Sequence, residues 1–266
     1  MGDSPHHFPG PGTLDRALAL VRYLRSECPW DAKQTAESLI PHLLEETHEV
    51  VEAIREGDAG ELEGELGDLL LNLAFQVVVA EEDGSMDADS IYGRLETKMI
   101  ARHPHVFGDA EHRSWEESKA AERSDGEGVL TGLARGLDPL TRAYRIQERV
   151  AGVGFDWADH QGALAKVEEE LGEVVQALEA RDARDAVGDD ELSAAVQEEV
   201  GDLLFAAVNL ARLTGVHPTN ALARANAKFT GRFERLEKRA RAQDIDLSTA
   251  GLDRLDQIWN DVKRDE

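Results

Sequence analysis

Cysteine is almost absent from this chain of 266 residues, since Cys28 is the only one. No intrachain disulfide and no metal site built from several thiolates can form, which favours a reducing, cytoplasmic location. Long apolar runs are missing as well. The longest, residues 69–80, is interrupted by Asn72 and Gln76 and is much shorter than the ~20 residues of a membrane-spanning helix. We therefore expect a protein that does not cross a membrane.

Positive charge is scarce: 29 Lys and Arg residues stand against 54 Asp and Glu residues, so the formal net charge is −25. This balance argues against broad contact with nucleic-acid phosphates or anionic membranes. A polyanionic ligand would need a cation as intermediary. Most of the acids have a plainer explanation, because carboxylates on solvated helix faces improve solubility.

Glycine and proline are too few for a fibrous or disordered protein, and 41% of the residues are hydrophobic. The length allows one large domain or two ordinary ones. Residues 1–12 contain three prolines and no apolar core like that of a signal peptide, so we expect them to form a disordered tail.

The apolar residues of the first half recur at the spacing of an α-helix. They predict a first helix from Leu14 to the break at Cys28-Pro29, and a second from near Thr35 to Gly57. A third apolar stripe predicts a helix that ends at Asp83-Gly84, and a fourth helix is expected over residues 89–102. No segment shows the alternation of a strand, and the fold class expected is all-α, of the four-helix-bundle type.

The same pattern begins again in the second half, with helical stripes over residues 140–150, 164–178 and 196–208. A small, polar and glycine-rich stretch precedes it. We interpret the chain as an internal duplication. The predicted organisation is a first domain at 13–123, a linker at 124–136 and a second, catalytic domain at 137–266.

The two halves share a pattern of acids. Glu45-Glu46-x-x-Glu49 is matched by Glu169-Glu170-x-x-Glu173, and Glu65-x-x-Asp68 is matched by Glu199-x-x-Asp202. Spacings of three and four residues place these carboxylates on one side of a helix, where they repel one another unless a cation neutralises them. Since all the ligands would be oxygens, a hard cation is favoured over Zn²⁺. We expect this cation to be Mg²⁺, with Mn²⁺ able to replace it.

Glycines stand between the acids, at Gly67, Gly172 and Gly201. Glycine inside a helix costs about 1 kcal/mol relative to alanine, so it usually marks the close approach of another helix or a ligand. We expect the acidic turns of each half to face one another.

Cations and aromatic residues recur further along each half. Lys98 and Arg102 are matched by Lys228 and Arg232, and Trp115 and Lys119 are matched by Trp259 and Lys263. Two cations one helical turn apart can hold phosphate oxygens, and a tryptophan can stack on a base. Taken singly, a Lys/Arg pair is typical of a solvated surface and a tryptophan is typical of a core. Because these residues repeat in the same order in both halves, we favour a role in binding nucleotide.

These features resemble the MazG family of nucleoside triphosphate pyrophosphohydrolases from about Leu14 to Lys263. The motifs that carry the resemblance are CPWD (28–31), LEE (44–46), GELGDLL (64–70), RHPHVF (102–107), VGFDW (153–157), GDLLF (201–205) and ANAKF (225–229). The resemblance implies an all-α homodimer in which helices of two chains complete the bundles. It also implies hydrolysis of NTPs and dNTPs to the monophosphate and pyrophosphate, with broad base specificity as our expectation.

The family pattern assigns roles to residues of the second half. Mg²⁺ would be held by Glu170, Glu173, Glu199 and Asp202, supported by Glu169 and Glu198. Nucleotide would be contacted by Lys166, Lys228, Arg232 and Trp259. We expect Lys263, one turn after Trp259, to bind the substrate as well. The first-half acids Glu46, Glu49, Glu65 and Asp68 rank second as metal ligands. His42 and Gly64 stand there in place of Lys166 and Glu198, which favours the second half as the catalytic one.

Two other interpretations stay open. A di-iron carboxylate bundle would use Glu-x-x-His motifs on two helices. Glu45-x-x-His48 is one such motif, but Gly172 replaces the histidine in the second half. The other is a nucleotide-binding regulatory protein with little turnover.

Overall fold

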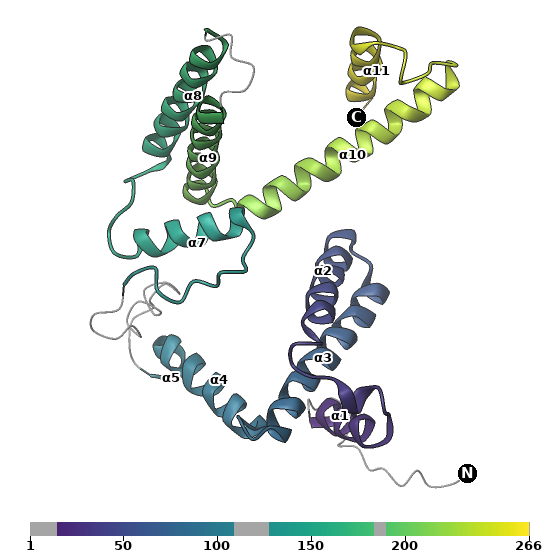
Figure 1. Ribbon diagram of the computed structural model, residues 1–266, viewed down its shortest axis with the longest axis vertical. Helices are drawn as coiled ribbons and strands as arrows, with labels where there is room; N and C mark the ends of the chain where they lie inside the picture. Colours follow the sequence, from purple (N-terminus) through teal and green to yellow (C-terminus); the bar gives the residue numbers. More distant parts are fainter. Residues whose placement is uncertain (1–14, 109–127, 184–189, 266) are drawn as a thin grey trace. The chain divides into compact units, whose positions relative to one another are not determined.

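The computed structural model describes residues 15–108, 128–183 and 190–265 (Figure 1). Every long regular element in these ranges is an α-helix, as predicted, and the chain divides into two compact units, Met1–Arg113 and Ser114–Glu266. The predicted tail and residues 124–127 of the predicted linker lie outside the described ranges. None of the described helices offers the uninterrupted apolar length that a bilayer crossing requires.

The first unit is a helical hairpin with a third helix against it. Its elements are α1 (Asp15–Glu27), the short 3-10 helix η1 (Asp31–Lys33), α2 (Ile40–Glu56), α3 (Ala59–Glu82), α4 (Ala88–Arg102) and α5 (Pro104–Phe107). Leu18 and Val21 of α1 pack on Phe75 and Val78 of α3 to form the core. Ion pairs from Arg22 to Glu81 and from Arg25 to Glu82 hold the same two helices together at the surface.

The turn between α2 and α3 follows from two adjacent residues. Gly57 adopts a left-handed conformation, with φ of 75°, which ends α2. Asp58 then caps α3, its side chain accepting hydrogen bonds from the backbone N–H groups of Gly60 and Glu61. Because the turn is short, α2 and α3 run side by side and their acids come together.

The predicted start of the second helix near Thr35 was wrong, because α2 begins five residues later at Ile40. Thr35 and Ser38 each donate a backbone N–H to the other's hydroxyl, at 2.9 and 3.1 Å. Such local bonds offer the backbone an alternative to the helix.

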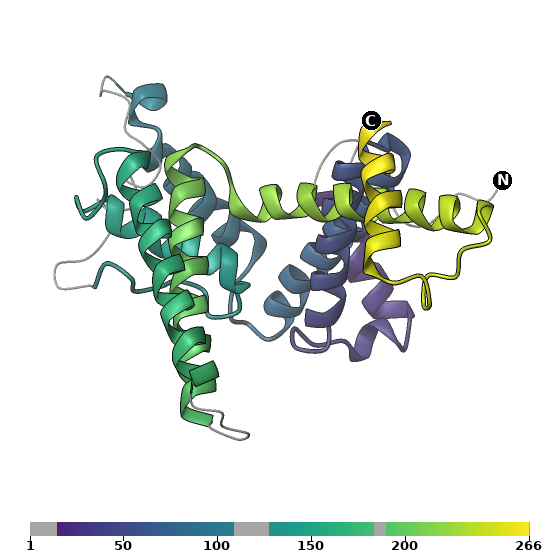
Figure 2. The same cartoon turned by 90° about the horizontal axis from the view of Figure 1, so that it is seen from above.

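The second unit repeats this order, with α8 longer than its counterpart α2 by seven residues, 24 against 17. Its elements are α7 (Pro139–Ala151), α8 (His160–Ala183), α9 (Asp190–Leu213), α10 (Pro218–Ala242) and α11 (Leu252–Arg264). Helices α8 and α9 form the hairpin, and α7 packs against α9 (Figure 1). Helix α10 has 25 residues and leads away from the hairpin at the end of α9 (Figure 2). Helix α11 folds back on α10, and the contact is made by Leu236, Ala240, Ile258 and Val262. We call α10 and α11 together the α10–α11 arm.

Asp138 caps α7, and its replacement by alanine should lower the free energy of unfolding by about 1 kcal/mol at pH 7. Its side chain accepts hydrogen bonds from the N–H groups of Leu140 and Thr141, both at 3.1 Å. Hydrogen bonding from the side chain of Thr141 is the main reason why the pKa of Asp138 lies below its usual value, followed by the bond from the Thr141 backbone N–H. Because the pKa of this carboxyl group is lower in the folded than in the unfolded protein, the ionised carboxylate stabilises the fold at pH values above the unfolded-state pKa. This stabilisation is lost as the pH falls through the folded-state pKa.

The difference between wild type and Asp138→Ala should therefore shrink below about pH 4, when urea unfolding is followed by circular dichroism at several pH values. Asp138→Asn is the matched control, because asparagine caps a helix nearly as well and does not titrate. Equal stability of wild type and the alanine variant at pH 7 would show that the cap contributes nothing.

Candidate functional site

The α8–α9 hairpin brings three carboxylates together in the second unit. Carboxylate oxygens of Glu170 on α8 and of Glu199 and Asp202 on α9 all lie within 4.8 Å of one another. We call these residues the acidic cluster. Glu199 and Asp202 are one helical turn apart, so they share a face of α9, and the hairpin sets that face against Glu170. Carboxylates at this spacing repel one another, and a divalent cation would reduce the repulsion.

Glu170 is the buried member of the cluster, with 4% of its surface exposed. Its Oε1 lies 2.6 Å from the Nζ of Lys166, one turn earlier on α8. Its other oxygen, Oε2, is buried and accepts no hydrogen bond within the described chain. Leaving a buried carboxylate oxygen without a donor is costly, so this atom marks a place for a bound cation.

The charges around Glu170 are strongly interdependent. The ion pair with Lys166 lowers the pKa of Glu170, and the same carboxylates raise the pKa of Lys166. The neighbouring Glu170 carboxylate in turn raises the pKa of Glu173, with a smaller contribution from Glu199. A proton held on Glu173 would be displaced by a cation, so Glu173 belongs electrostatically with the acidic cluster although it is not one of its three converging residues.

The two supporting acids lie at the edge of the cluster. Glu169 is exposed and its Oε1 accepts a hydrogen bond from the Nζ of Lys166 at 2.9 Å. Glu198 is exposed on α9 and lies outside the group of converging oxygens. Both carboxylates are open to solvent.

The predicted nucleotide contacts lie on other helices. Lys228 and Arg232 are on α10, and Trp259 and Lys263 are on α11. Trp259 packs against the core between α10 and α11 and lies 5.1 Å from Phe229, measured between ring centroids. Because the α10–α11 arm leads away from the α8–α9 hairpin, the single chain does not bring these residues over the acidic cluster (Figures 1 and 2).

The first unit has a corresponding cluster at Glu46, Glu49 and Glu65, whose oxygens also lie within 4.8 Å of one another. We call it the N-terminal cluster. Burial, followed by repulsion from Asp68, raises the pKa of Glu46, and burial followed by repulsion from Glu49 raises that of Glu65. Asp68 itself is exposed and does not join the three converging residues.

The N-terminal cluster lacks a lysine. His42 lies at the position matching Lys166, and its nearest acid is Glu45, at 3.8 Å. Glu46 is only half-buried where Glu170 is buried. Trp115 and Lys119, the predicted aromatic and cation of this half, lie outside the described residues.

Among the described residues, the glycines of the acidic turns contact no other helix. A Cβ atom built on Gly67, Gly172 or Gly201 would meet nothing within 4 Å. The expectation that they mark the close approach of another helix was therefore wrong for a single chain. The acidic turns of each half do face one another, as expected, because their carboxylate oxygens converge across the hairpin. Large apolar side chains are exposed on the same hairpin, namely Leu164, Leu171, Val175, Val200, Leu204 and Phe205. Both features leave a surface of α8 and α9 open to another molecule.

One feature of the site escaped the sequence analysis. A pocket lies between α7 and α9, and its walls include Gln147 of α7 and Phe205, Asn209 and Arg212 of α9. The only signal in the sequence was the motif at 153–157, which contributes the remaining wall. This motif belongs to the family pattern, but nothing in the spacing of its residues indicates a cavity.

Comparison with known proteins agrees with the geometry. The model of the MazG nucleotide pyrophosphohydrolase domain matches residues 34–107 and 158–236, one segment in each unit. A nucleoside triphosphate pyrophosphohydrolase of Escherichia coli (strain K12) is 41% identical over 95% of this chain and 98% of its own length. The nucleoside triphosphate pyrophosphohydrolase/pyrophosphatase MazG of Thermotoga maritima is 39% identical over 94% and 95%. The chain belongs to the MazG family.

Proposed function

We propose that this protein hydrolyses nucleoside triphosphates and their deoxy forms between the α- and β-phosphates, releasing the monophosphate and pyrophosphate. The observation that carries the proposal is the buried carboxylate of Glu170, which meets Glu199 and Asp202 across the hairpin and whose Oε2 has no donor among the described residues. The names of the relatives from E. coli and T. maritima describe this activity in those proteins.

The donor set favours Mg²⁺, with Mn²⁺ able to replace it. Glu170, Glu199 and Asp202 offer only carboxylate oxygens, and Glu173 would add another. Hard cations bind such oxygens, whereas Zn²⁺ prefers histidine and cysteine ligands. When bound, Mg²⁺ would neutralise the charge on triphosphate oxygens.

The residues of the chain would then supply position and proton transfer. Lys166 holds the carboxylate of Glu170 in place through the 2.6 Å ion pair. Glu169, exposed beside it, would orient a water molecule and take its proton as the water oxygen attacks the α-phosphorus. The bond to the β-phosphate breaks and pyrophosphate leaves. This chemistry relies on positioning and electrostatics, so a covalent nucleophile is unnecessary.

A homodimer would complete the site. Phosphate contacts from Lys228 and Arg232 are needed near the acidic cluster, but in one chain the α10–α11 arm leads away from it (Figure 2). The open glycines and exposed apolar side chains of α8 and α9 provide a surface that a second copy would cover. The arm of one copy would then supply cations to the acids of the other.

Catalysis belongs to the second unit in this proposal. The N-terminal cluster lacks both the lysine and the buried carboxylate that distinguish the acidic cluster. It could still hold a cation weakly, without the contacts that position a triphosphate for attack.

The purified protein should convert ATP to AMP and pyrophosphate with Mg²⁺ and should stop when EDTA is added. Product separation by ion-exchange chromatography distinguishes the two possible cleavages. Release of ADP and orthophosphate would contradict the proposed bond, and full turnover in EDTA would rule out the metal. Binding of ATP without turnover would favour a regulatory nucleotide-binding protein, and a visible absorption band would favour a di-iron site.

A further inference from the structure

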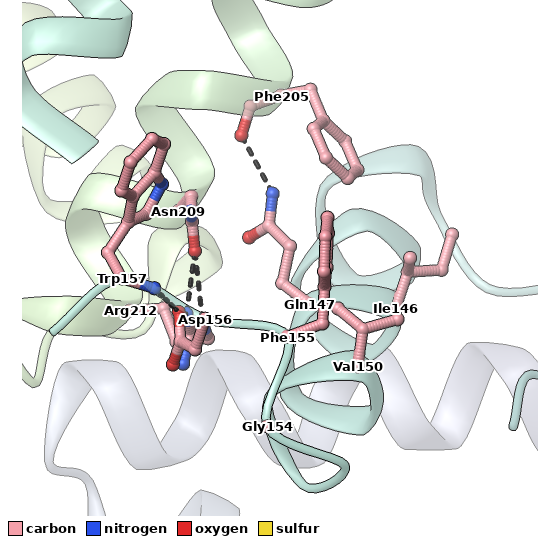
Figure 3. A pocket seen from close by; sticks show the side chains of 10 residues that line it. All are labelled: Ile146, Gln147, Val150, Gly154, Phe155, Asp156, Trp157, Phe205, Asn209 and Arg212. Atoms are coloured by element: carbon pink, nitrogen blue, oxygen red, sulfur yellow. Dashed lines mark hydrogen bonds and ion pairs between the residues drawn. The ribbon is translucent and has the colours of Figure 1, made fainter. Parts of the chain in front are cut away.

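One ion pair fastens the segment that leads into α8 to the end of α9 (Figure 3). Asp156 lies in this segment, four residues before α8, and Arg212 lies in the last turn of α9. Nη2 of Arg212 donates to Oδ1 of Asp156, and the two side chains are 12% and 23% exposed. Because both are largely buried, parting them would leave charges poorly solvated and unpaired, so the pair resists separation.

Both members of the ion pair are held in direction by further hydrogen bonds, which Figure 3 marks with dashed lines. Nε and Nη2 of Arg212 donate to Oδ1 of Asn209, about one turn earlier on α9, at 3.1 and 2.8 Å. Oδ1 of Asp156 also accepts the backbone N–H of Trp157 at 2.9 Å. The ion pair therefore joins one defined point on α9 to one defined point in the segment before α8.

Trp157 extends this connection to α8 itself. A Cβ atom built on Gly162 would lie 2.6 Å from Cε3 of the indole, so the ring lies against the backbone where a larger residue would collide with it. Gly162 belongs to the first turn of α8. A continuous connection thus runs from the end of α9 to the start of α8, through Arg212, Asp156, Trp157 and Gly162. We call it the α8–α9 tie.

Apolar packing gives the same two helices little hold on each other. Among the described residues, the apolar side chains that α8 and α9 bury are small, namely Ala163, Val174, Ala206 and Val208. Their large apolar side chains are exposed instead. Small side chains make fewer atomic contacts than large ones, so packing alone resists the sliding of one helix along the other only weakly. The α8–α9 tie supplies a constraint against sliding.

The α8–α9 tie lies at similar distances from the acids of both helices. Glu170 follows Gly162 by eight residues, a rise of about 12 Å along α8, and Asp202 precedes Arg212 by ten, about 15 Å along α9. Since the hairpin runs antiparallel, these distances bring the carboxylates level with each other. Sliding by one residue would move them about 1.5 Å apart. Mg²⁺ tolerates this poorly, because it requires near-ideal octahedral geometry with bonds of about 2.0–2.1 Å.

The first unit makes an equivalent connection with an arginine from another helix. Arg25 of α1 has a side chain that is 9% exposed and pairs with Glu82, the last residue of α3, at 2.6 Å. Its Nη1 donates to the backbone oxygens of Asp31 and Gln34, in the segment before α2, at 2.7 and 3.0 Å. Both units therefore fasten the segment before the second helix to the end of the third, although different residues do so.

We propose that Asp156 and Arg212 are positioning residues: their ion pair fixes α8 lengthwise against α9 at the spacing that the acidic cluster needs to hold a divalent cation. The inference rests on the function proposed above, which places a cation at this cluster. Neither residue belongs to the cluster, and each acts through the helix that carries the carboxylates. Residues that hold metal ligands in place typically contribute tenfold to hundredfold to metal affinity.

Mn²⁺ binding, measured from the electron paramagnetic resonance signal of the free ion, tests the proposal without turnover. All proteins compared carry Glu49→Ala, so that the N-terminal cluster does not contribute. The dissociation constant for Mn²⁺ should rise about tenfold in Asp156→Ala. Glu82→Ala is the matched control, because it breaks the corresponding ion pair of the first unit, and its affinity should be unchanged. No rise in Asp156→Ala, or an equal rise in Glu82→Ala, would overturn the proposal.

Reversing the ion pair separates its role from that of the side-chain shapes. The double variant Asp156→Arg with Arg212→Asp should regain most of the Mn²⁺ affinity that Asp156→Arg alone loses, and an absence of recovery would overturn the proposal. Circular dichroism checks the helical content of each variant. If Asp156→Ala does not fold, Asp156→Asn replaces it, since the amide oxygen still accepts a hydrogen bond from Arg212. A smaller rise in the dissociation constant is then expected, and no rise would overturn the proposal.

The Mg²⁺ dependence of turnover gives a further measurement. In Asp156→Ala the Mg²⁺ concentration for half-maximal pyrophosphate release from ATP should rise about tenfold, while kcat at saturating Mg²⁺ stays within a few-fold of wild type. A lower kcat with unchanged Mg²⁺ dependence would overturn the proposal. If ATP is hydrolysed but neither metal measurement depends on Asp156, the α8–α9 tie is overturned and the proposed function stands. If Mn²⁺ affinity depends on Asp156 but no nucleotide is hydrolysed, the proposed function fails and the positioning role stands.

Discussion

Asp202→Ala should lower kcat for pyrophosphate release by about a thousandfold, the equivalent of roughly 4 kcal/mol in the barrier. Asp202 is an exposed member of the acidic cluster, and its carboxylate oxygen lies within 4.8 Å of those of Glu170 and Glu199. Removing it takes away one of the three carboxylates that converge in the cluster. Because the residue is exposed, the helical content measured by circular dichroism should be unchanged.

Asp68→Ala is the matched control, because Asp68 has the corresponding position in the N-terminal half. We expect its activity to stay within a few-fold of wild type, since the N-terminal cluster lacks the lysine that accompanies the buried Glu170. Glu173→Ala and Glu49→Ala form a second pair. We expect Glu173→Ala to lose activity as Asp202→Ala does, and Glu49→Ala to stay within a few-fold of wild type as Asp68→Ala does. If the first-half variants lose as much as the second-half variants, catalysis does not belong to the second unit alone.

Mixing two inactive variants should restore activity if each site combines acids of one chain with cations of another. Lys228→Ala alone should lose about a hundredfold, as expected for one charged donor to the reacting phosphates. When Asp202→Ala and Lys228→Ala are unfolded and refolded together, half of the dimers contain one of each. One of their two sites has wild-type acids and a wild-type arm, so about a quarter of the wild-type activity should return.

The control mixture pairs Asp202→Ala with the double variant carrying both changes. No chain in it has wild-type acids, and no activity should return whichever way the chains assemble. An absence of recovery in the first mixture as well would mean that Lys228 acts on the acids of its own chain. The helices would then have to move, because α10 leads away from the hairpin in the structure (Figure 1).

Most of the fold could be predicted because its signals are local. The apolar stripe from Leu62 to Val77 follows the helical period, and α3 (Ala59–Glu82) forms there. The start of α2 was missed because Thr35 and Ser38 exchange hydrogen bonds that periodicity does not reveal. Local side-chain bonds of this kind decide where a helix begins within a few residues.

The candidate site was predictable only where its residues repeat along one helix. The spacing of Glu199 and Asp202 shows that they share a face, and the duplication pairs them with Glu170. The burial of Glu170 depends on how α8 packs, which spacing does not show. The pocket joins Gln147 to Asn209 and Phe205 from a different helix, so it exists only after α7 has packed against α9.

Helix α10 runs for 25 residues, about 37 Å, between its anchor beside α7 and its junction with α11. The number of residues in a rigid helix fixes both how far along the axis a later residue lies and in which direction around the axis its side chain points. One residue inserted between Pro218 and Lys228 would turn everything beyond it by about 100°, whereas four would nearly restore the direction and add about 6 Å. The direction in which Lys228 points is therefore set by the number of residues before it in α10. We expect the protein to tolerate insertions or deletions here only when they amount to whole helical turns.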